Sequence, residues 1–266
     1  GIASPILALS GGRPAWEGRA GLAEVVQVAQ AADRLGYEFL TCPDHVAVPG
    51  GLYRGERFYD PLSTFSYLAA VTRRIRFLPY VLVLPFYHPL EIIKRYGSLD
   101  YLSGGRLTLG VGVGNLEEEF QVLHVPFADR GARADDALRA IRAGMSKRIV
   151  SYKGEYFEFE NLIVEPHAVQ PQVPIWVGGH SRRALQRAVT LADGWAPAPV
   201  QFRGPGIDEL KGVLAALDRP PGFDVLVGPE PALDPMGEPH QVADVLGAAQ
   251  AAGGTVFRLT VVHDSL

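Results

Sequence analysis

The segment Ile75–Leu84, IRFLPYVLVL, is an almost unbroken run of apolar residues. Such a run, without the alternation of a half-exposed strand, is typical of a β-strand buried on both faces of a parallel sheet. Pro79 lies inside the run and has no amide hydrogen for the sheet ladder, so we expect a bulge or bend there. Arg106–Val113, RLTLGVGV, is the next apolar run and predicts a second strand of the same kind.

Segments with helical periodicity separate the apolar runs. Leu22–Leu35 places apolar residues three and four positions apart, and Gly36 supplies a C-terminal stop. His88-Pro89 puts a proline at the first position of another helix, which Ser103-Gly104-Gly105 ends. Further helices are predicted at Pro61–Val71, Asp129–Gly144, Ser181–Ala192, Ile207–Leu217 and Pro239–Ala252.

Strands and helices therefore alternate along the chain. The eight predicted strands are Pro5–Leu9, Tyr37–Cys42, Ile75–Leu84, Arg106–Val113, Pro174–Val177, Gly194–Ala196, Phe223–Val227 and Val256–Val262. Alternation of this kind makes a parallel sheet with right-handed crossovers, and eight units suit a closed barrel without edge strands. We predict an α/β protein, a (β/α)₈ TIM-like barrel forming a single domain over residues 1–266. An open doubly wound sheet, which usually has six strands, is the alternative.

The segment Gly114–Val173 interrupts this alternation. It contains the helix at Asp129–Gly144 and a predicted hairpin, Tyr152–Phe159, but no clear core strand. Connections this long tend to be functional lids. We therefore expect an insertion, or lid, at about residues 115–173, after the fourth strand.

Composition narrows the function classes. The net charge is −4 and the basic residues are scattered, so no basic stripe indicates nucleic acid. Tyr80–Tyr87 is apolar but far shorter than the ~20 residues of a membrane span. Cys42 is the single cysteine, and the histidines form no H-x-H or H-E-x-x-H pair, so we expect no disulfide and no metal site. These features favour a cytoplasmic protein without a nucleic-acid or membrane partner.

Candidate site residues are sought where strands end, because active sites of such barrels lie at the C-terminal ends of the strands. Gly178-Gly179-His180-Ser181 follows a strand and opens a helix. Free amides and the dipole of a helix N-terminus attract anions, and glycine lets a phosphate approach the backbone. Arg182 and Arg183 add positive charge. The pattern predicts a phosphate site; a tight turn with a solvated arginine pair is the structural alternative.

Two other strand ends carry recognisable patterns. Gly110–Gly114, GVGVG, lacks the spacing of a dinucleotide fingerprint, and Glu117-Glu118-Glu119 follows it. We interpret the glycines as room for a flat ring against the backbone, with close barrel packing as the alternative. At the end of the second strand, Asp44-His45 pairs a carboxylate with an imidazole, which suits proton transfer near neutral pH. The structural alternative is a loop or helix cap.

Blocks spread over most of the chain resemble the luciferase-like monooxygenase superfamily, particularly its bacterial branch that depends on the deazaflavin coenzyme F420. The blocks are Ala31–Leu40 with Pro43-Asp44-His45, Leu82–Pro89, Leu99–Gly114, Arg130–Asp136, Tyr152–Phe159, Pro166–Gly179 and Ala188–Pro197. Each block is unspecific alone, but their common order is a strong signal. One departure is Asn115, where many relatives have an aromatic residue.

The resemblance implies a barrel that binds FMN or coenzyme F420 at the strand ends. It implies a ring beside Tyr80, Val81 and Leu82, a pocket lined by Gly112, Val113 and Gly114, and a phosphate held by Val177, Gly178, Gly179, His180 and Ser181. The family often has a non-proline cis peptide bond in the first of these segments. His45, with Asp44 behind it, matches the position that the deazaflavin branch uses near the ring and the substrate.

These expectations combine into an oxidoreductase that transfers a hydride between coenzyme F420 and a small organic substrate. His45 would donate or accept the accompanying proton, and Asp44 would set the tautomer of His45. An FMN-dependent monooxygenase, a non-catalytic flavin- or deazaflavin-binding barrel, and a barrel for an unrelated phosphorylated ligand are the alternatives. A homodimer is expected because barrels of this family commonly dimerise.

Overall fold

The computed structural model describes residues 1–9, 14–50, 57–197, 207–228, 232–234 and 236–265. Its helices are α1 (Ala15–Arg19), α2 (Leu22–Arg34), α3 (Pro61–Val71), α4 (Pro89–Ser103), α5 (Glu117–Val122), α6 (Arg130–Gly144), α7 (Arg182–Leu191), α8 (Ile207–Ala215) and α9 (Pro239–Ala251). Its strands are β1 (Ala8–Leu9), β2 (Phe39–Cys42), β3 (Arg57–Phe58), β4 (Arg76–Pro79), β5 (Leu82–Val83), β6 (Leu109–Gly112), β7 (Ile149–Lys153), β8 (Glu158–Ile163), β9 (Ile175–Gly178), β10 (Gly194–Ala196), β11 (Asp224–Val227) and β12 (Val256–Phe257).

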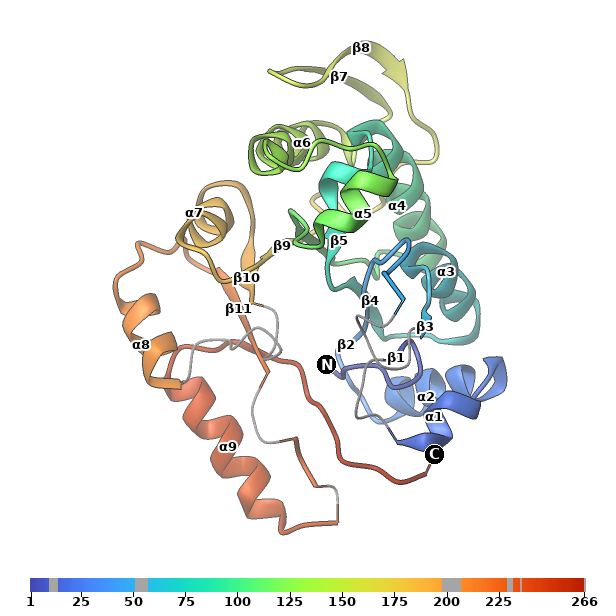
Figure 1. Cartoon of the computed structure of the whole chain (residues 1–266), viewed down its shortest axis with the longest axis vertical. Coiled ribbons are helices and arrows are strands. Elements are labelled where there is room, and N and C mark those ends of the chain that lie inside the picture. Colours follow the sequence, from blue (N-terminus) through green and yellow to red (C-terminus); the bar gives the residue numbers. More distant parts are fainter. Residues whose placement is uncertain (10–13, 51–56, 198–206, 229–231, 235, 266) are drawn as a thin grey trace.

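Parallel strands are arranged around a ring, with helices outside it (Figure 1). Strands β5, β6, β9, β10, β11 and β12 form one parallel sheet, and β2 and β4 form a parallel pair. Isolated parallel bridges join the two groups: Phe77 pairs with Leu107 at one side, and Ile2 pairs with both Leu40 and Leu259 at the other. The predicted TIM-barrel-like α/β fold is confirmed, although its strands are assigned to separate sheets.

The first strand does not lie where the sequence indicated. Residues around Ile2, and not Pro5–Leu9, enter the ring, with the Ile2 amide donating to the Phe39 carbonyl at 2.9 Å. Ile6 has a positive φ of 74°, which turns the chain out of the strand. The following β1 instead pairs antiparallel with β3. Periodicity alone could not detect a turn at a β-branched residue, because such residues rarely adopt positive φ.

The third barrel strand is divided at its middle. β4 ends at Pro79 and pairs with β2, whereas β5 begins at Leu82 and pairs with β6. The bend expected at the proline is present, and the Tyr80–Val81 peptide bond is cis, as the family resemblance implied. The main ladder is therefore with β2 before the interruption and with β6 after it, and the Phe77–Leu107 bridge already links β4 to the β6 side.

The predicted helices are confirmed within a few residues of their expected bounds. In α4 the His88 side chain accepts a hydrogen bond from the Leu90 amide at 3.2 Å, and Gly104 ends the helix with a φ of 71°. The short helices α1 and α5 were not predicted. No helix in the described ranges is long and apolar enough to cross a membrane.

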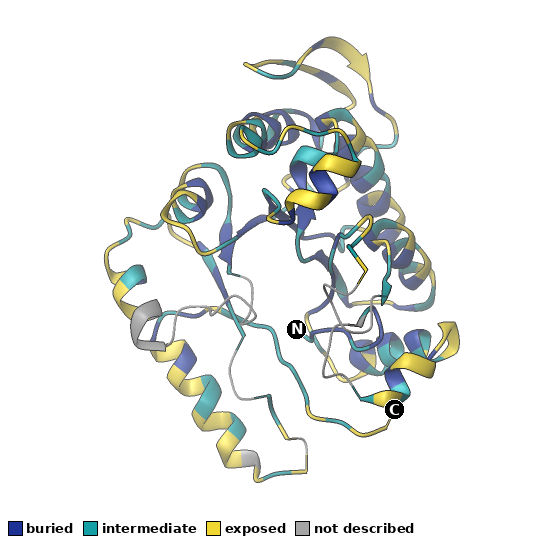
Figure 2. Cartoon of the chain, in the orientation of Figure 1, coloured by how far each residue is buried: buried dark blue, intermediate teal, exposed yellow. Residues whose placement is uncertain are grey.

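The core has two parts. A large cluster lies between the strands and the helices, whose buried faces point toward the ring (Figure 2). A smaller cluster contains only strand residues, so it fills the ring itself: Phe39, Leu78, Trp176, Ala196 and Leu226. This division follows from alternation, because successive side chains of a strand point to opposite faces.

The predicted insertion after β6 contains α5, the barrel helix α6 and the hairpin β7–β8. Asp136 of α6 anchors the hairpin by accepting hydrogen bonds from the Tyr152 hydroxyl at 2.5 Å and the Tyr156 amide at 2.7 Å. The hairpin projects beyond α6, away from the ring (Figure 1). The part of this segment that contacts a strand-end loop is α5, through Glu119.

Close approach of β6 to β4 predicts opposite effects of one substitution at two glycines. A Cβ at Gly110 would lie 2.1 Å from the Pro79 carbonyl oxygen, whereas a Cβ at Gly247, on the exposed side of α9, would meet nothing within 4 Å. Gly110→Ala should therefore lower the free energy of unfolding by about 3 kcal/mol or more. Gly247→Ala should raise it by about 0.5–1 kcal/mol, because alanine favours helix interiors. Urea unfolding midpoints measure both; equal midpoints for the two variants would contradict this packing.

Candidate functional site

The candidate site residues follow adjacent strands at one end of the ring. In the parallel register Cys42 lies opposite Pro79, Val83 opposite Gly112, and Gly178 opposite Ala196. The segments 44–45, 80–82, 112–114 and 177–181 therefore emerge from the same, C-terminal end of the strands. This is the end at which barrel enzymes place their chemistry.

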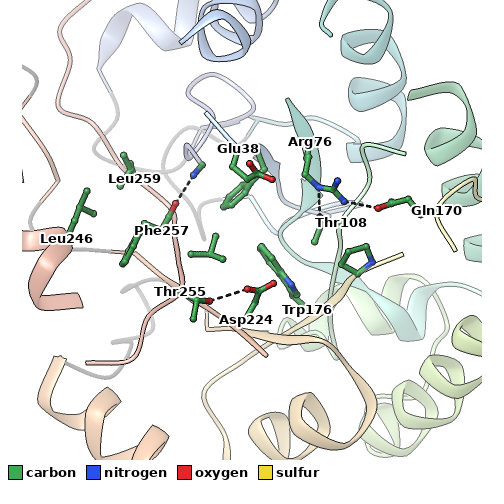
Figure 3. Close-up of a pocket in the computed structure, with 14 residues that line it drawn as sticks. Glu38, Arg76, Thr108, Gln170, Trp176, Asp224, Leu246, Thr255, Phe257 and Leu259 are labelled. Carbon is green, nitrogen blue, oxygen red and sulfur yellow. Dashed lines mark hydrogen bonds between the residues drawn. The ribbon is translucent and has the colours of Figure 1, made fainter. Parts of the chain in front are cut away.

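A cavity of about 670 Å³ lies at the opposite end of the strands (Figure 3). Residues that begin strands line it, including Phe39, Arg76 and Asp224. The Arg76 guanidinium is engaged with Thr108 Oγ1 and Gln170 Oε1, both at 3.1 Å. Because the cavity opens at the strand starts, it is separate from the candidate site.

Val81 occupies the space beside two of the candidate glycines. A Cβ at Gly112 would lie 2.5 Å from Val81 Cγ2, and a Cβ at Gly178 would lie 2.6 Å from Val81 Cγ1. The glycines thus accommodate a side chain of the neighbouring strand, which is the packing alternative to a ring lying directly on the β6 backbone. The contact with Val81 favours the packing alternative at Gly112, and a cofactor ring at this glycine stays a prediction.

Gly114 and its neighbour Val113 complete the end of β6. Gly114 has a positive φ of 75°, and a Cβ there would lie 2.7 Å from the Phe120 ring and 2.8 Å from Val83. The Gly114 carbonyl accepts a hydrogen bond from Arg130 Nε at 3.2 Å. Val113 is partly buried against the core. Gly114 therefore lets α5 pack closely on the strand end.

The remaining residues of the predicted ring-binding segment differ in where their side chains lie. Leu82 and Val177 are buried in the core between strands and helices, so only their backbones are available to a ligand. Tyr80 packs against the cluster inside the ring, and its hydroxyl donates to the Pro197 carbonyl. The Arg258 guanidinium lies 5.1 Å from the centre of the Tyr80 ring, and burial raises the pKa of Tyr80 to about 12.

The turn from β9 into α7 has the form expected of an anion site. Gly179 has a φ of 107°, and Ser181 caps α7 by accepting a hydrogen bond from the Ala184 amide at 3.1 Å. The buried Trp195 donates to the Gly179 carbonyl at 2.8 Å and so orients the turn from β10. His180, between Gly179 and Ser181, is exposed. Because its Oγ is used by the helix, Ser181 contributes here as the N-cap.

Asp44 is buried and does not orient His45 through a hydrogen bond. Its carboxylate accepts hydrogen bonds from the Val83 amide and the Tyr87 hydroxyl, both at 2.9 Å. Burial raises the pKa of Asp44 to about 6, against the lowering effect of these two donors. The expectation that Asp44 sets the tautomer of His45 was wrong, because Val83 of β5 and Tyr87 take up both carboxylate oxygens.

Glu119 is the carboxylate that contacts His45. Its Oε2 lies 3.0 Å from His45 Nδ1, and its Oε1 accepts from the amides of Val46 at 2.9 Å and Ala47 at 3.3 Å. Glu119 was not predicted as a site residue, because it lies in the run Glu117-Glu118-Glu119. One signal was present in the sequence: Glu119 and Phe120 lie three and four positions after the apolar Leu116, on the helix face that the structure buries. Glu117 and Glu118 are exposed.

The buried Asp44 predicts a pH dependence of stability. Between its usual pKa of 3.8 and about 6, the folded protein holds a proton that the unfolded chain releases. The free energy of unfolding should therefore fall as the pH rises through this window, by up to about 3 kcal/mol. Asp44→Asn removes this loss, so its stability relative to wild type should rise between about pH 4 and pH 7. Urea titrations over that range measure the difference, with Asp218→Asn, an exposed site, as the control; a pH-independent difference would contradict it.

A family model described as "Luciferase-like monooxygenase" matches residues 6–235. Among related sequences, the uncharacterized protein Rv0940c of Mycobacterium tuberculosis is 34% identical over 208 residues, covering 73% of this chain and 70% of that protein. A second uncharacterized protein of the same organism, Rv0953c, is 30% identical over 211 residues, covering 72% and 73%.

Three solved structures share the fold. Monooxygenase RslO1 from Streptomyces bottropensis has a TM-score of 0.58 at 23% identity, covering 96% of this chain and 67% of its own. The coenzyme F420-dependent tetrahydromethanopterin reductase of Methanopyrus kandleri has a TM-score of 0.62 at 18% identity. The match covers 77% of this chain and 61% of the reductase chain. Apo-MsnO8 has a TM-score of 0.67 at 18% identity, and the match covers 99% of this chain and 92% of the MsnO8 chain. The family model matches most of the chain, so this protein belongs to the luciferase-like monooxygenase family.

Proposed function

We propose that the protein is an oxidoreductase that transfers a hydride between coenzyme F420 and a small organic substrate. The observation that carries the proposal is the convergence at one end of the ring of an anion-type turn at Gly178–Ser181 and an anchored imidazole, His45. A phosphate-bearing redox cofactor needs the first, and a proton that accompanies the hydride needs the second. Membership of an oxidoreductase and monooxygenase superfamily supports the class of chemistry.

The turn before α7 fits a phosphate group. The backbone amides in the first turn of a helix have no hydrogen-bond acceptor within the helix. Here Ser181 Oγ accepts a hydrogen bond from one of them, the Ala184 amide. The amides of Arg182 and Arg183 lie in the same turn, and both side chains are exposed and positive. Gly179 adds a backbone without Cβ at the approach. These groups would hold the phosphate end of F420 or FMN.

The segment Tyr80–Leu82 fits the ring end of such a cofactor through its backbone and Val81. Val81 lies between Gly112 and Gly178, so its side chain forms an apolar surface at the strand ends. Tyr80 is fixed by Pro197 and Arg258, and Leu82 is fixed in the core. A surface held from three sides suits a flat ring that must be positioned accurately.

In the proposed mechanism the bound cofactor supplies the two-electron hydride chemistry, and the chain's own residues position and protonate. His45 would hold the mobile proton on its imidazole, the side chain most often used for general acid–base catalysis. Asp44 ties the loop that carries His45 to β5 through the Val83 amide. The partly exposed His45 is 22% accessible, so a substrate can reach its ring while Glu119 beneath it stays buried.

An FMN-dependent monooxygenase is the second candidate. RslO1, which shares the fold, is a monooxygenase, whereas the Methanopyrus kandleri neighbour is an F420-dependent reductase. We favour F420 because the Asp44-His45 pair matches the deazaflavin branch. A non-catalytic cofactor-binding barrel is a third candidate, and assembly as a homodimer remains a prediction from the family resemblance.

A fluorescence titration of the purified protein with coenzyme F420, and separately with FMN, tests the cofactor. Tighter binding of F420 supports hydride transfer with the deazaflavin. Preference for FMN would transfer the assignment to the monooxygenases, and absence of binding by either would refute a cofactor enzyme. Competition by inorganic phosphate alone, without cofactor binding, would indicate an unrelated phosphorylated ligand.

The phosphate assignment predicts a charge effect at Gly179. Gly179→Asp should weaken F420 binding by about 100-fold or more, because a carboxylate would lie at the anion site. Gly179→Asn is the matched control: it imposes the same backbone burden at a φ of 107° and the same size without the charge. Dissociation constants from the titration measure both. Equal affinities for the aspartate and asparagine variants would refute phosphate binding at this turn.

The role of His45 predicts a separation of binding from turnover. His45→Ala should leave the F420 dissociation constant within about twofold and reduce turnover by about 100-fold, the usual contribution of general acid–base catalysis. His240→Ala, at an exposed position of α9, is the control. Absorbance of the reduced and oxidised cofactor follows turnover with any substrate found by screening. Unchanged turnover of His45→Ala would remove this residue from the mechanism.

A further inference from the structure

We infer that Glu119 is a positioning residue that fixes the tautomer of His45, with the ring proton on Nδ1 and proton transfer at Nε2. The tautomer follows from contacts in this chain alone. Its use in catalysis rests on the proposed function. Glu119 lies 74 residues from His45 in sequence and reaches it from α5.

The two oxygens of Glu119 face different partners. Oε1 accepts from the backbone amides of Val46 and Ala47, which are donors only. Oε2 faces His45 Nδ1 at 3.0 Å, and the side chain is only 3% exposed. A buried carboxylate needs hydrogen-bond donors, and these two amides together with the imidazole supply them.

An ionised carboxylate accepts hydrogen bonds and donates none. His45 Nδ1 must therefore carry the hydrogen in this contact, and in a neutral imidazole the other nitrogen, Nε2, is then unprotonated. Nε2 becomes the atom that takes up a proton. When it has done so, Glu119 remains beside the positive ring and stabilises it.

The loop after β2 is held on two sides by two carboxylates. Asp44 binds Val83 of β5 and Tyr87, and Glu119, from α5, binds the three residues that follow Asp44. The Phe58 ring packs 4.6 Å from the His45 ring and restricts its rotation from a third direction. Two charged groups flank His45: Glu119 contacts its ring, and Asp44 lies next to it in the chain.

Glu119→Gln should reverse the tautomer. A carboxamide has one acceptor oxygen, and the two backbone amides at the Oε1 position require it there. The NH₂ group then takes the Oε2 position and donates to His45 Nδ1, which must become the acceptor. The ring hydrogen therefore moves to Nε2. Because glutamine has the same shape as glutamate, the loop and helix should keep their positions.

Long-range ¹H–¹⁵N correlation spectra of protein labelled with ¹⁵N-histidine measure the tautomer directly at a pH where the ring is neutral. The signal lost in His45→Asn identifies His45 among the histidines. We expect the Nδ1–H form in wild type and in Glu118→Gln, an exposed neighbour on the same helix, and the Nε2–H form in Glu119→Gln. An Nε2–H ring in wild type, or an unchanged tautomer in Glu119→Gln, would overturn the inference.

The spectra are recorded without cofactor, so they decide the tautomer whether or not F420 binds. Absence of F420 binding would refute the proposed function and leave this result standing. If F420 binds and a substrate is found, Glu119→Gln should lower kcat by about tenfold or more with little change in KM, because the wrong nitrogen then faces the substrate. A reversed tautomer with unchanged kcat would overturn the positioning role.

Discussion

The interruption of the third barrel strand is the constraint on which the rest of the site depends. β4 makes its main ladder with β2 and bridges to Leu107 through Phe77, whereas β5 pairs with β6, so the main ladder crosses from one neighbour to the other between them. This crossing turns Val81 toward Gly112 and Gly178 and brings the Val83 amide to Asp44. Bulkier residues at the two glycine positions would collide with Val81, so the glycines of β6 and β9 are requirements of the divided strand.

Two buried carboxylates hold the loop that follows β2. Asp44 joins its loop to β5 and Tyr87, and Glu119 joins the same loop to α5. Both carboxylates are buried, whereas the His45 imidazole is partly exposed. The arrangement holds a titratable ring on a rigid base, which a proton-transfer group needs. The adjacent Asp-His dipeptide in the sequence conceals this, because the neighbouring carboxylate faces away from the histidine it precedes.

The family and the function stand on different grounds. The family model and the arrangement of strands around a ring agree on a luciferase-like fold. Fold alone does not select the cofactor, and the structural neighbours include both a monooxygenase and an F420-dependent reductase. The proposal for F420 therefore depends on the particular residues at the strand ends, above all His45 and the turn before α7. The hairpin β7–β8, which the sequence suggested as part of a lid, projects beyond α6, away from the ring of strands (Figure 1).

Much of the fold and part of the site could be predicted from the sequence, because strand and helix periodicities, proline positions and glycine stops are local signals. They located most barrel strands, the bend at Pro79, the helix α4 from His88 to Gly104, and the beginning of α7 at Ser181. Only the tertiary structure decided which groups meet: Ile2 in the ring in place of Pro5–Leu9, Val81 against Gly112, and Glu119 in place of Asp44 beside His45. Those pairings join residues far apart in the chain, and their partners are chosen by packing and by the hydrogen-bonding needs of buried groups, which no local pattern records.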